Sequence, residues 1–206
     1  NTKNKPQVMY CLTSFLTKTG SKLHNIGFKN GSINLAGAQP NSLYIPSLFA
    51  ERNIMNLAKG KVNDIIKAYN LIGKDTSKVL TQVCSATSLT KVIPDNSIDY
   101  IFVDPPFGEN LMYSELNFLW ESWLKVFTNN KSEAIINASQ NKKLDEYYQL
   151  MLRSFKEFYK ILKHKRWLTV EFHNSKSSVW NVIQEAISKA GFIITQVTIL
   201  DKQQVT

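Results

Sequence analysis

Apolar residues follow two kinds of pattern along this chain. Short apolar runs recur at 79–83, 100–103, 167–172 and 192–200, and we expect each of them to form a β-strand. Between these runs, apolar residues return at three- and four-residue steps over 144–162, which is typical of an amphipathic helix. We also expect helices over 116–127, which is rich in aromatic residues, and over 177–189, which Ser177 or Ser178 would cap and Gly191 would end. One more helix is expected over 47–71, because Pro46 suits the start of a helix.

The order of these elements predicts an α/β fold. Strands that alternate with helices form a mostly parallel sheet flanked by helices. The strand 100–103 is apolar at every position, so we expect it to be buried on both faces. In such sheets, ligands bind at the carboxyl ends of the strands. Residues 1–41 are polar, and we expect an irregular segment to which the sequence assigns no role.

Composition and charge exclude several classes of protein. The 206 residues are 43% hydrophobic, which is enough for a folded core and excludes a disordered polymer. Twenty-five basic residues against 16 acidic ones give a net charge of +9, which favours a polyanionic partner, first of all nucleic acid. No apolar run is long enough to span a membrane, so we expect no membrane partner. The two cysteines do not make a disulfide framework, and for this reason we expect a cytoplasmic, reducing compartment. Two cysteines and three histidines follow no metal-ligand spacing, and we expect no metal site.

The tetrapeptide Asp104-Pro105-Pro106-Phe107 follows directly after the strand 100–103. The two prolines fix φ and stiffen the turn. The Asp104 carboxylate and the Pro105 carbonyl are two acceptors that suit the two hydrogens of an amine, and the Phe107 ring offers a face for a planar base. The simpler alternative is a Pro-Pro turn with a capping aspartate.

This tetrapeptide resembles the (D/N/S)PP(Y/F) motif of the amino methyltransferases that use S-adenosylmethionine. Residues 93–124 look like a bacterial group of adenine-specific DNA methylases, with a Tyr-x-Glu-Leu segment at Tyr113 and Glu115 and a helix that contains Trp-Leu. Phe107 replaces the commoner tyrosine and keeps the stacking face. The segments 155–163, 170–174, 179–180, 190–192 and 201–202 look like the downstream half of the same group.

The resemblance covers residues 42–206 and implies a Rossmann-like methyltransferase domain. It further implies methyl transfer from S-adenosylmethionine to the exocyclic amine of a base in DNA, most simply adenine N6, after the base is flipped out of the duplex. Asp104 and Pro105 would bind the amine, Pro106 would stiffen the loop and Phe107 would stack on the base. Two alternatives stay open: an RNA guanine-N2 methyltransferase, which uses a similar loop, and a nucleic-acid-binding chain without catalysis.

Further candidate residues follow from their position near the same sheet edge and from the resemblance. For the cofactor these are Ser85, Ala86 and Thr87, together with Asp104, although the first three also suit a plain turn. For the substrate the candidates are Gly108, Asn110, Tyr113, Glu115, His173 and Asn174. Tyr113 and Glu115 suit the start of a helix equally well.

A group of basic residues extends from the last turns of the helix 144–162 to the start of the strand 167–172. Its members are Lys156, Lys160, Lys163, Lys165 and Arg166. Such a group is usually a solvated surface, and the functional alternative is contact with the phosphates of a nucleic acid.

One feature departs from the family pattern. The family holds the methionine part of its cofactor with a glycine-rich loop after a strand, and the eight glycines of this chain are scattered without such a loop. We therefore expect a fragment of a longer methylase whose upstream part carries the loop and is its partner in the same chain. We expect the fragment alone to be inactive and to bind S-adenosylmethionine weakly or not at all.

Overall fold

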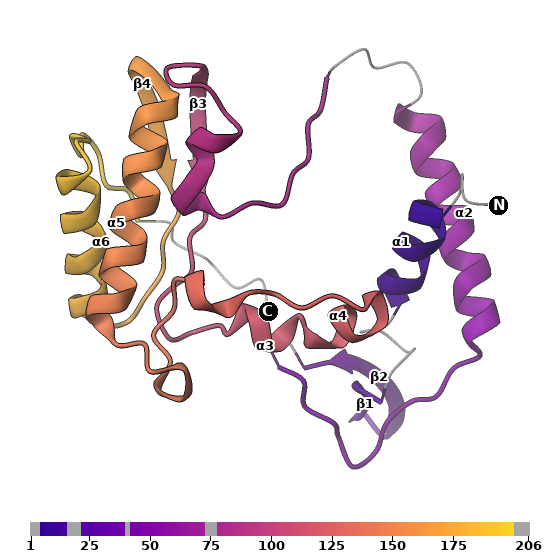
Figure 1. Ribbon diagram of the computed structural model, residues 1–206. Helices are drawn as coiled ribbons and strands as arrows, with labels where there is room; N and C mark the ends of the chain where they lie inside the picture. The colour runs from indigo at the N-terminus through magenta and orange to yellow at the C-terminus, as the bar shows by residue number, and fades with distance from the viewer. Residues whose placement is uncertain (1–4, 16–21, 40–41, 73–77, 200–206) are drawn as a thin grey trace. The chain divides into compact units, whose positions relative to one another are not determined.

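The computed structural model describes residues 5–15, 22–39, 42–72 and 78–199. The chain forms two compact units, the first made of 1–81 and 113–129 and the second of 82–112 and 130–206 (Figure 1). No helix within the described ranges is both long enough and apolar enough to cross a lipid bilayer.

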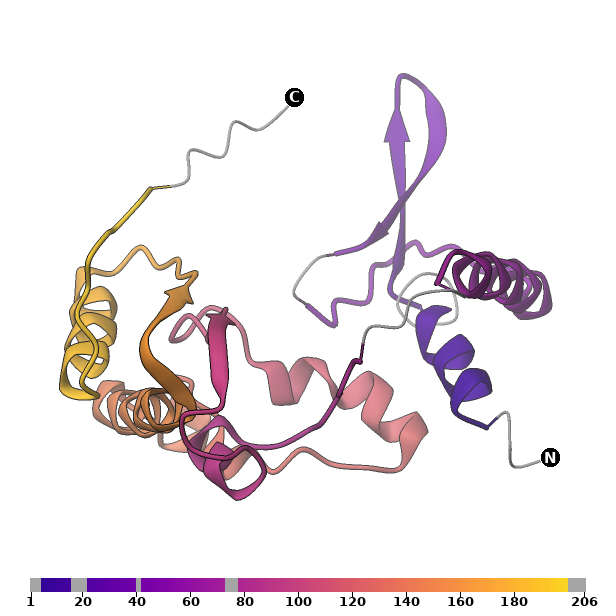
Figure 2. The same cartoon turned by 90° about the horizontal axis from the view of Figure 1, so that it is seen from above.

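Two helices of the first unit pack side by side. They are α1 (Lys5–Phe15) and α2 (Ile54–Ile72), and the Cys11 thiol of α1 lies 3.9 Å from the Ala58 carbonyl oxygen of α2 (Figure 2). The helix that we expected over 47–71 begins only at Ile54. The reason is Asn53, whose side-chain oxygen accepts hydrogen bonds from the backbone amides of Met55 (2.9 Å) and Asn56 (3.2 Å) and so caps the first turn.

A β-hairpin lies in the segment that we expected to be irregular. Strands β1 (His24–Lys29) and β2 (Ser32–Ala38) pair antiparallel. Asn30 and Gly31 join them with φ values of 52° and 75°. Asn-Gly with both residues at positive φ is the preferred two-residue hairpin turn, because its twist matches that of the strands. Together with α1, the hairpin shows that the irregular character expected for 1–41 is wrong.

The helix that we expected over 116–127 is two short helices of the first unit. They are α3 (Tyr113–Leu116) and α4 (Phe118–Leu124). The second ends at Lys125, which adopts a left-handed conformation with φ 56°. The indole nitrogen of Trp120 donates a hydrogen bond to the Thr13 carbonyl oxygen at 3.2 Å, which ties α4 to the end of α1.

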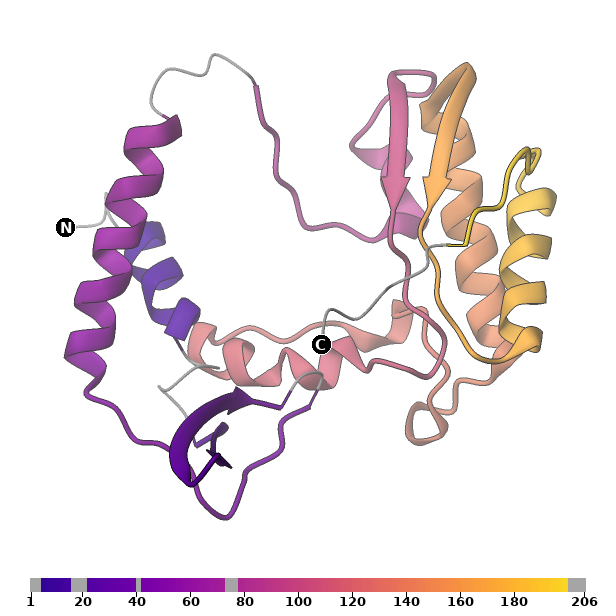
Figure 3. The ribbon, with the colours of Figure 1, turned by 180° about the vertical axis from the view of Figure 1, so that it is seen from behind.

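The second unit is built on a small parallel sheet. Strand β3 (Ile98–Val103) pairs with β4 (Leu162–Val170), with Val103 opposite Val170 at the carboxyl end. Figure 3 shows the two arrows side by side and pointing the same way. The α/β class is therefore confirmed. The described part of this unit also contains the short 3-10 helices η2 (Ala86–Lys91), η3 (Asn130–Ser132) and η4 (Ala138–Gln140).

Two amphipathic helices cover one face of this sheet. They are α5 (Leu144–Ile161) and α6 (Ser177–Lys189), and both lie where the apolar spacing predicts them (Figure 3). Leu168 and Val170 of β4 pack against the core between them. The buried residues of that core are Tyr147, Met151, Phe155, Val179, Ile183, Ala186 and Ala190.

The opposite face of the sheet carries exposed aromatic side chains. Tyr100 is 55% exposed, Phe102 58% and Trp167 63%. The expectation that the strand 100–103 is buried on both faces is therefore wrong. Its residues alternate between the helix-covered face and a face that no element of the described second unit covers.

Two of the expected strands are not formed. Residues 79–83 and 192–199 contain no strand, and residue 200 lies outside the described part. Val83 is fully exposed and Ile193 is 87% exposed. An apolar run becomes a strand only where a neighbouring strand offers free backbone groups, and the run itself does not determine that neighbour.

Candidate functional site

Strands β3 and β4 end at the same edge of the sheet. The Glu171 amide donates a hydrogen bond to the Val103 carbonyl oxygen at 2.9 Å, one step beyond the last paired residues. As a result, the segment Asp104–Phe107 and the segment Glu171–Asn174 leave the sheet next to each other. The DPPF tetrapeptide thus lies at the carboxyl edge of a parallel sheet, where ligands of α/β proteins bind.

Aromatic rings surround Phe107 at this edge. Its ring meets Phe172 edge to face, with centroids 5.3 Å apart and an angle of 87°, and the imidazole of His173 is 6.5 Å away at 78°. Phe172 in turn packs against Trp180 of α6 at 5.1 Å and 89°. These contacts fix the plane of the half-buried Phe107 ring.

Three successive backbone carbonyls in this loop accept hydrogen bonds from the protein. Pro106 accepts from the Tyr147 hydroxyl at 2.6 Å, and Phe107 accepts from the Asn174 side-chain amide at 2.8 Å. Gly108 accepts from the Ile136 amide at 3.1 Å. The donors come from α5, from the segment after β4 and from the segment before η4, so three separate parts of the second unit hold the loop.

The two acceptors before these carbonyls are open. The Asp104 side chain is exposed, and no residue of the described second unit hydrogen-bonds or ion-pairs with its carboxylate. Within the same part of the chain, no group donates to the Pro105 carbonyl. A carboxylate and a neighbouring carbonyl can together accept two hydrogen bonds from a ligand that has two N–H donors.

Asn174 serves the protein's own loop. The residue is 7% exposed, and its side-chain oxygen accepts a hydrogen bond from the Lys176 amide at 2.7 Å while its nitrogen binds Phe107. Its backbone carbonyl accepts from the Trp180 indole nitrogen at 2.8 Å. Asn174 therefore connects the two segments at the edge. Of the two residues expected here for the substrate, His173 is the exposed one.

Gly108 turns the loop back into the protein. Its φ is +72°, and a side chain there would lie 3.3 Å from Val179, 3.4 Å from Asn174 and 3.4 Å from Ile136. The positive φ favours glycine, and the 3.3 Å distance means that the Val179 side chain would have to shift slightly to admit a larger residue. Gly108 is buried, whereas Asn110, also expected near the substrate, is exposed.

Tyr147 is the residue of this site that the sequence reasoning missed. It is fully buried, and burial raises the pKa of its hydroxyl far above the ordinary value, so the hydroxyl remains a proton donor. In the sequence it is one member of the apolar stripe of α5. The sequence could have indicated Tyr147 on chemical grounds, because a tyrosine in a buried apolar stripe needs a hydrogen-bond partner for its hydroxyl.

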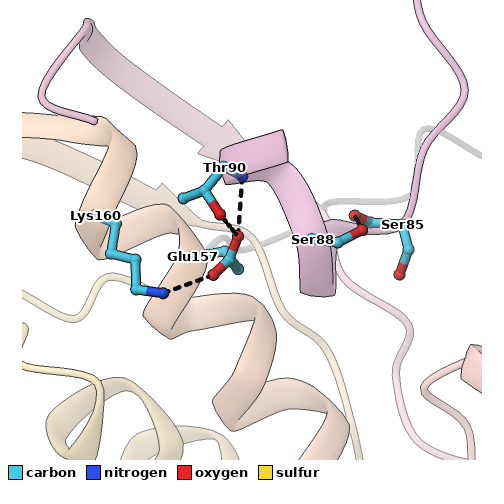
Figure 4. Close-up of polar contacts among 5 residues, drawn as sticks. All are labelled: Ser85, Ser88, Thr90, Glu157 and Lys160. Atoms are coloured by element: carbon cyan, nitrogen blue, oxygen red, sulfur yellow. Dashed lines mark hydrogen bonds and ion pairs between the residues drawn. The ribbon is translucent and has the colours of Figure 1, made fainter. Parts of the chain in front are cut away.

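The cofactor candidates Ser85, Ala86 and Thr87 begin the helix η2. The Ser85 hydroxyl accepts a hydrogen bond from the Thr87 amide at 3.3 Å and thereby caps this helix. The Ser88 hydroxyl donates to the Ser85 carbonyl at 3.4 Å (Figure 4). In the described part of the chain, no hydrogen bond or ring contact connects these residues with the DPPF loop.

Tyr113 and Glu115 lie in α3 and belong to the first compact unit. The DPPF loop, His173 and Asn174 belong to the second. The arrangement described above is therefore formed by the second unit alone.

Most of the basic group is paired with carboxylates. Lys163 lies 2.8 Å from Asp99, and Arg166 lies 3.3 Å from the same carboxylate. Lys160 lies 3.0 Å from Glu157, which also accepts hydrogen bonds from the amide and hydroxyl of Thr90 (Figure 4). Three of the five cations thus have a local partner, which weakens the case for phosphate contacts.

The second unit does not fit the methionine part of S-adenosylmethionine. Its two glycines are Gly108 and Gly191, and each is closely packed: the Tyr159 ring lies 3.0 Å from where a side chain on Gly191 would begin. Neither glycine opens space for a ligand. Among the described residues, no three His, Cys, Asp or Glu side chains gather to hold a metal ion.

Comparisons of the chain with protein-family models, with curated proteins and with solved structures found no match.

Proposed function

We propose that the DPPF edge binds the exocyclic amine of a nucleic-acid base, as the amine-binding part of a DNA adenine-N6 methyltransferase. The observation that carries this proposal is the pair of open acceptors, the Asp104 carboxylate and the Pro105 carbonyl, beside the fixed ring of Phe107. The resemblance of residues 93–124 to adenine-specific DNA methylases supports the same assignment.

The chemistry of an adenine amine suits these groups. The amine carries two hydrogens, and hydrogen bonds to a charged acceptor are stronger than those between neutral groups. Acceptors on both hydrogens increase the electron density on the nitrogen, which makes it a better nucleophile. A flat ring beside the acceptors orients the base so that positioning lowers the barrier. The base must leave the duplex to reach such a site, and the net charge of +9 suits a DNA partner.

We also propose that β3 and β4 are part of a larger Rossmann-like sheet. Parallel sheets occur almost only with both faces covered. The exposed aromatic face of Tyr100, Phe102 and Trp167 is the surface that a second layer of helices would cover. The extended apolar segments 79–83 and 192–199 have the composition of additional strands.

S-adenosylmethionine supplies the methyl group in the family that the chain resembles. Because the glycines of the second unit do not fit it, we assign the cofactor to no residue described here. We propose that these 206 residues bind and orient the base and do not by themselves transfer a methyl group.

Binding of the amine can be measured with two DNA duplexes that differ only in one group. Each carries one unpaired purine, adenine in the first and unsubstituted purine, without the amine, in the second. We expect the chain to prefer adenine by about tenfold, the value for one charge-assisted hydrogen bond. Asp104→Ala should remove the preference, whereas Asp104→Asn should keep part of it, because an amide oxygen still accepts.

Asp95→Ala is the matched control, since Asp95 is an exposed aspartate before the amino end of β3. Equal affinity of the unaltered chain for the two duplexes would contradict the proposal. In cells that carry the gene of the intact methylase, nucleoside mass spectrometry should detect N6-methyladenine in DNA and lose it with Asp104→Ala in that intact protein. Gene-dependent N2-methylguanine in RNA would instead favour the RNA enzyme.

A further inference from the structure

The carbonyls of the DPPF loop compete as acceptors. Pro105 and Pro106 are adjacent, lack an N–H group and each present one backbone carbonyl. A ligand amine that reaches Asp104 could pair its second hydrogen with either carbonyl. Which carbonyl is available determines the position and tilt of the bound base.

Tyr147 resolves this competition. Its hydroxyl lies 2.6 Å from the Pro106 oxygen and comes from a fully buried side chain in the middle of the α5–α6 core. Met151, one turn further along α5, is 2% exposed and belongs to the same core. The donor is therefore held by packing and cannot turn away to solvent.

Asn174 binds the carbonyl of Phe107, the next residue, in the same way. Its amide nitrogen donates to the Phe107 carbonyl, and its buried side chain is fixed at the other end by the Lys176 amide. The Pro106 and Phe107 carbonyls thus both point to buried donors inside the second unit. Of the carbonyls of Pro105, Pro106 and Phe107, that of Pro105 is the one without such a donor among the described residues of this unit.

We propose that Tyr147 is a positioning residue that withholds the Pro106 carbonyl from the ligand and leaves the Asp104 carboxylate and the Pro105 carbonyl as the pair that binds the amine. This inference rests on the proposed function and adds to it the residue that selects the acceptors. Tyr147 itself does not touch the base.

The test uses Tyr147→Phe, which removes only the hydroxyl. With the adenine and purine duplexes described above, we expect the variant to lower the preference for adenine from about tenfold to below about threefold, the loss expected when a single hydrogen bond no longer holds an acceptor in place. Affinity for the purine duplex should change by less than about twofold. A general loosening of the core would instead weaken binding of both duplexes equally.

Tyr148→Phe is the matched control. Tyr148 is the next residue of α5, and its hydroxyl lies 3.3 Å from the Glu185 carboxylate of α6, away from the loop. The control removes the same atom from the same helix, and it should keep the full adenine preference. Unchanged preference in Tyr147→Phe, or an equal loss in both variants, would overturn the inference. If the unaltered chain shows no adenine preference, the proposed function fails first.

A second measurement needs no variant and covers the case in which Tyr147→Phe is poorly folded. Proline labelled with ¹³C at the carbonyl gives separate signals for Pro105 and Pro106. Titration with the adenine duplex should shift the Pro105 signal and leave the Pro106 signal in place, because the Pro106 carbonyl points to the fully buried Tyr147 hydroxyl and not to the ligand. A shift of the Pro106 signal alone would overturn the inference, even if adenine is preferred.

Discussion

Single polar side chains hold the irregular parts of the second unit in place. Asn174 binds the DPPF loop and the start of α6 at once. The buried Lys142 donates from its ammonium group to the Glu133 carbonyl at 2.6 Å and also to the Asn130 carbonyl. Glu157 of α5 receives both the amide (2.9 Å) and the hydroxyl (2.7 Å) of Thr90 and so fixes η2. Loops that lack regular hydrogen bonds are ordered here by one residue each.

Glu157 gives stability a defined dependence on pH. Hydrogen bonds lower the pKa of this carboxyl from 4.5 to about 2. The backbone amide of Thr90 contributes most, and the Thr90 hydroxyl and the Lys160 ammonium group add to it. Because the folded pKa is the lower one, the stabilisation is present above pH 4.5 and is lost as the pH falls towards 2. We expect Glu157→Gln to lower the free energy of unfolding at pH 7 by on the order of 2 kcal/mol.

Urea unfolding at pH 7, 5 and 3 tests this expectation. The difference between Glu157→Gln and the unaltered chain should narrow from pH 5 to pH 3. Glu185→Gln, at an exposed ion pair with Lys189, should change the free energy of unfolding by less than about 0.5 kcal/mol at each pH. A constant difference for Glu157→Gln across this range would contradict the assigned role of the carboxylate.

At the scale of elements, the sequence was most informative where burial is periodic. The spacing of apolar residues predicts α5 and α6 with nearly the observed ends, because one face of each helix must be buried. The DPPF edge could also be predicted, since parallel strands end at one edge. The pairing of 79–83 and 192–199 could not, because it depends on neighbours that the local sequence does not specify. The hairpin was predictable from Asn30-Gly31.

The absence of a strand at 192–199 can be tested by comparing two isoleucines. Ile183 of α6 is 2% exposed, so Ile183→Ala should cost about 2–5 kcal/mol of the free energy of unfolding. Ile193 is 87% exposed, and Ile193→Ala should cost less than about 0.5 kcal/mol. Thermal or urea unfolding of both variants measures the contrast. Comparable losses would mean that the segment around Ile193 is buried in solution.

At the scale of the whole molecule, the positive net charge does not mean that each basic residue is available to bind a polyanion. The value of +9 is a property of the full chain, whereas Lys160, Lys163 and Arg166 each have a carboxylate beside them. Sequence spacing placed these cations together but could not show the partner of Lys163 and Arg166, because Asp99 is distant along the chain. For the same reason, the partners of the DPPF carbonyls, which come from 136, 147 and 174, became visible only in the fold.

The single neighbour of β3 has a consequence for amide hydrogen exchange. The backbone N–H groups of a strand point alternately to its two sides, and within the described residues β3 pairs on one side only, with β4. The pairing of β3 with β4 is regular over 100–103, and we expect every second amide there to be protected and the others to exchange almost as fast as in an unfolded peptide. Exchange followed by NMR would show this alternation. Uniform protection along β3 would mean that another strand occupies its free side, and the amides concerned would identify its register.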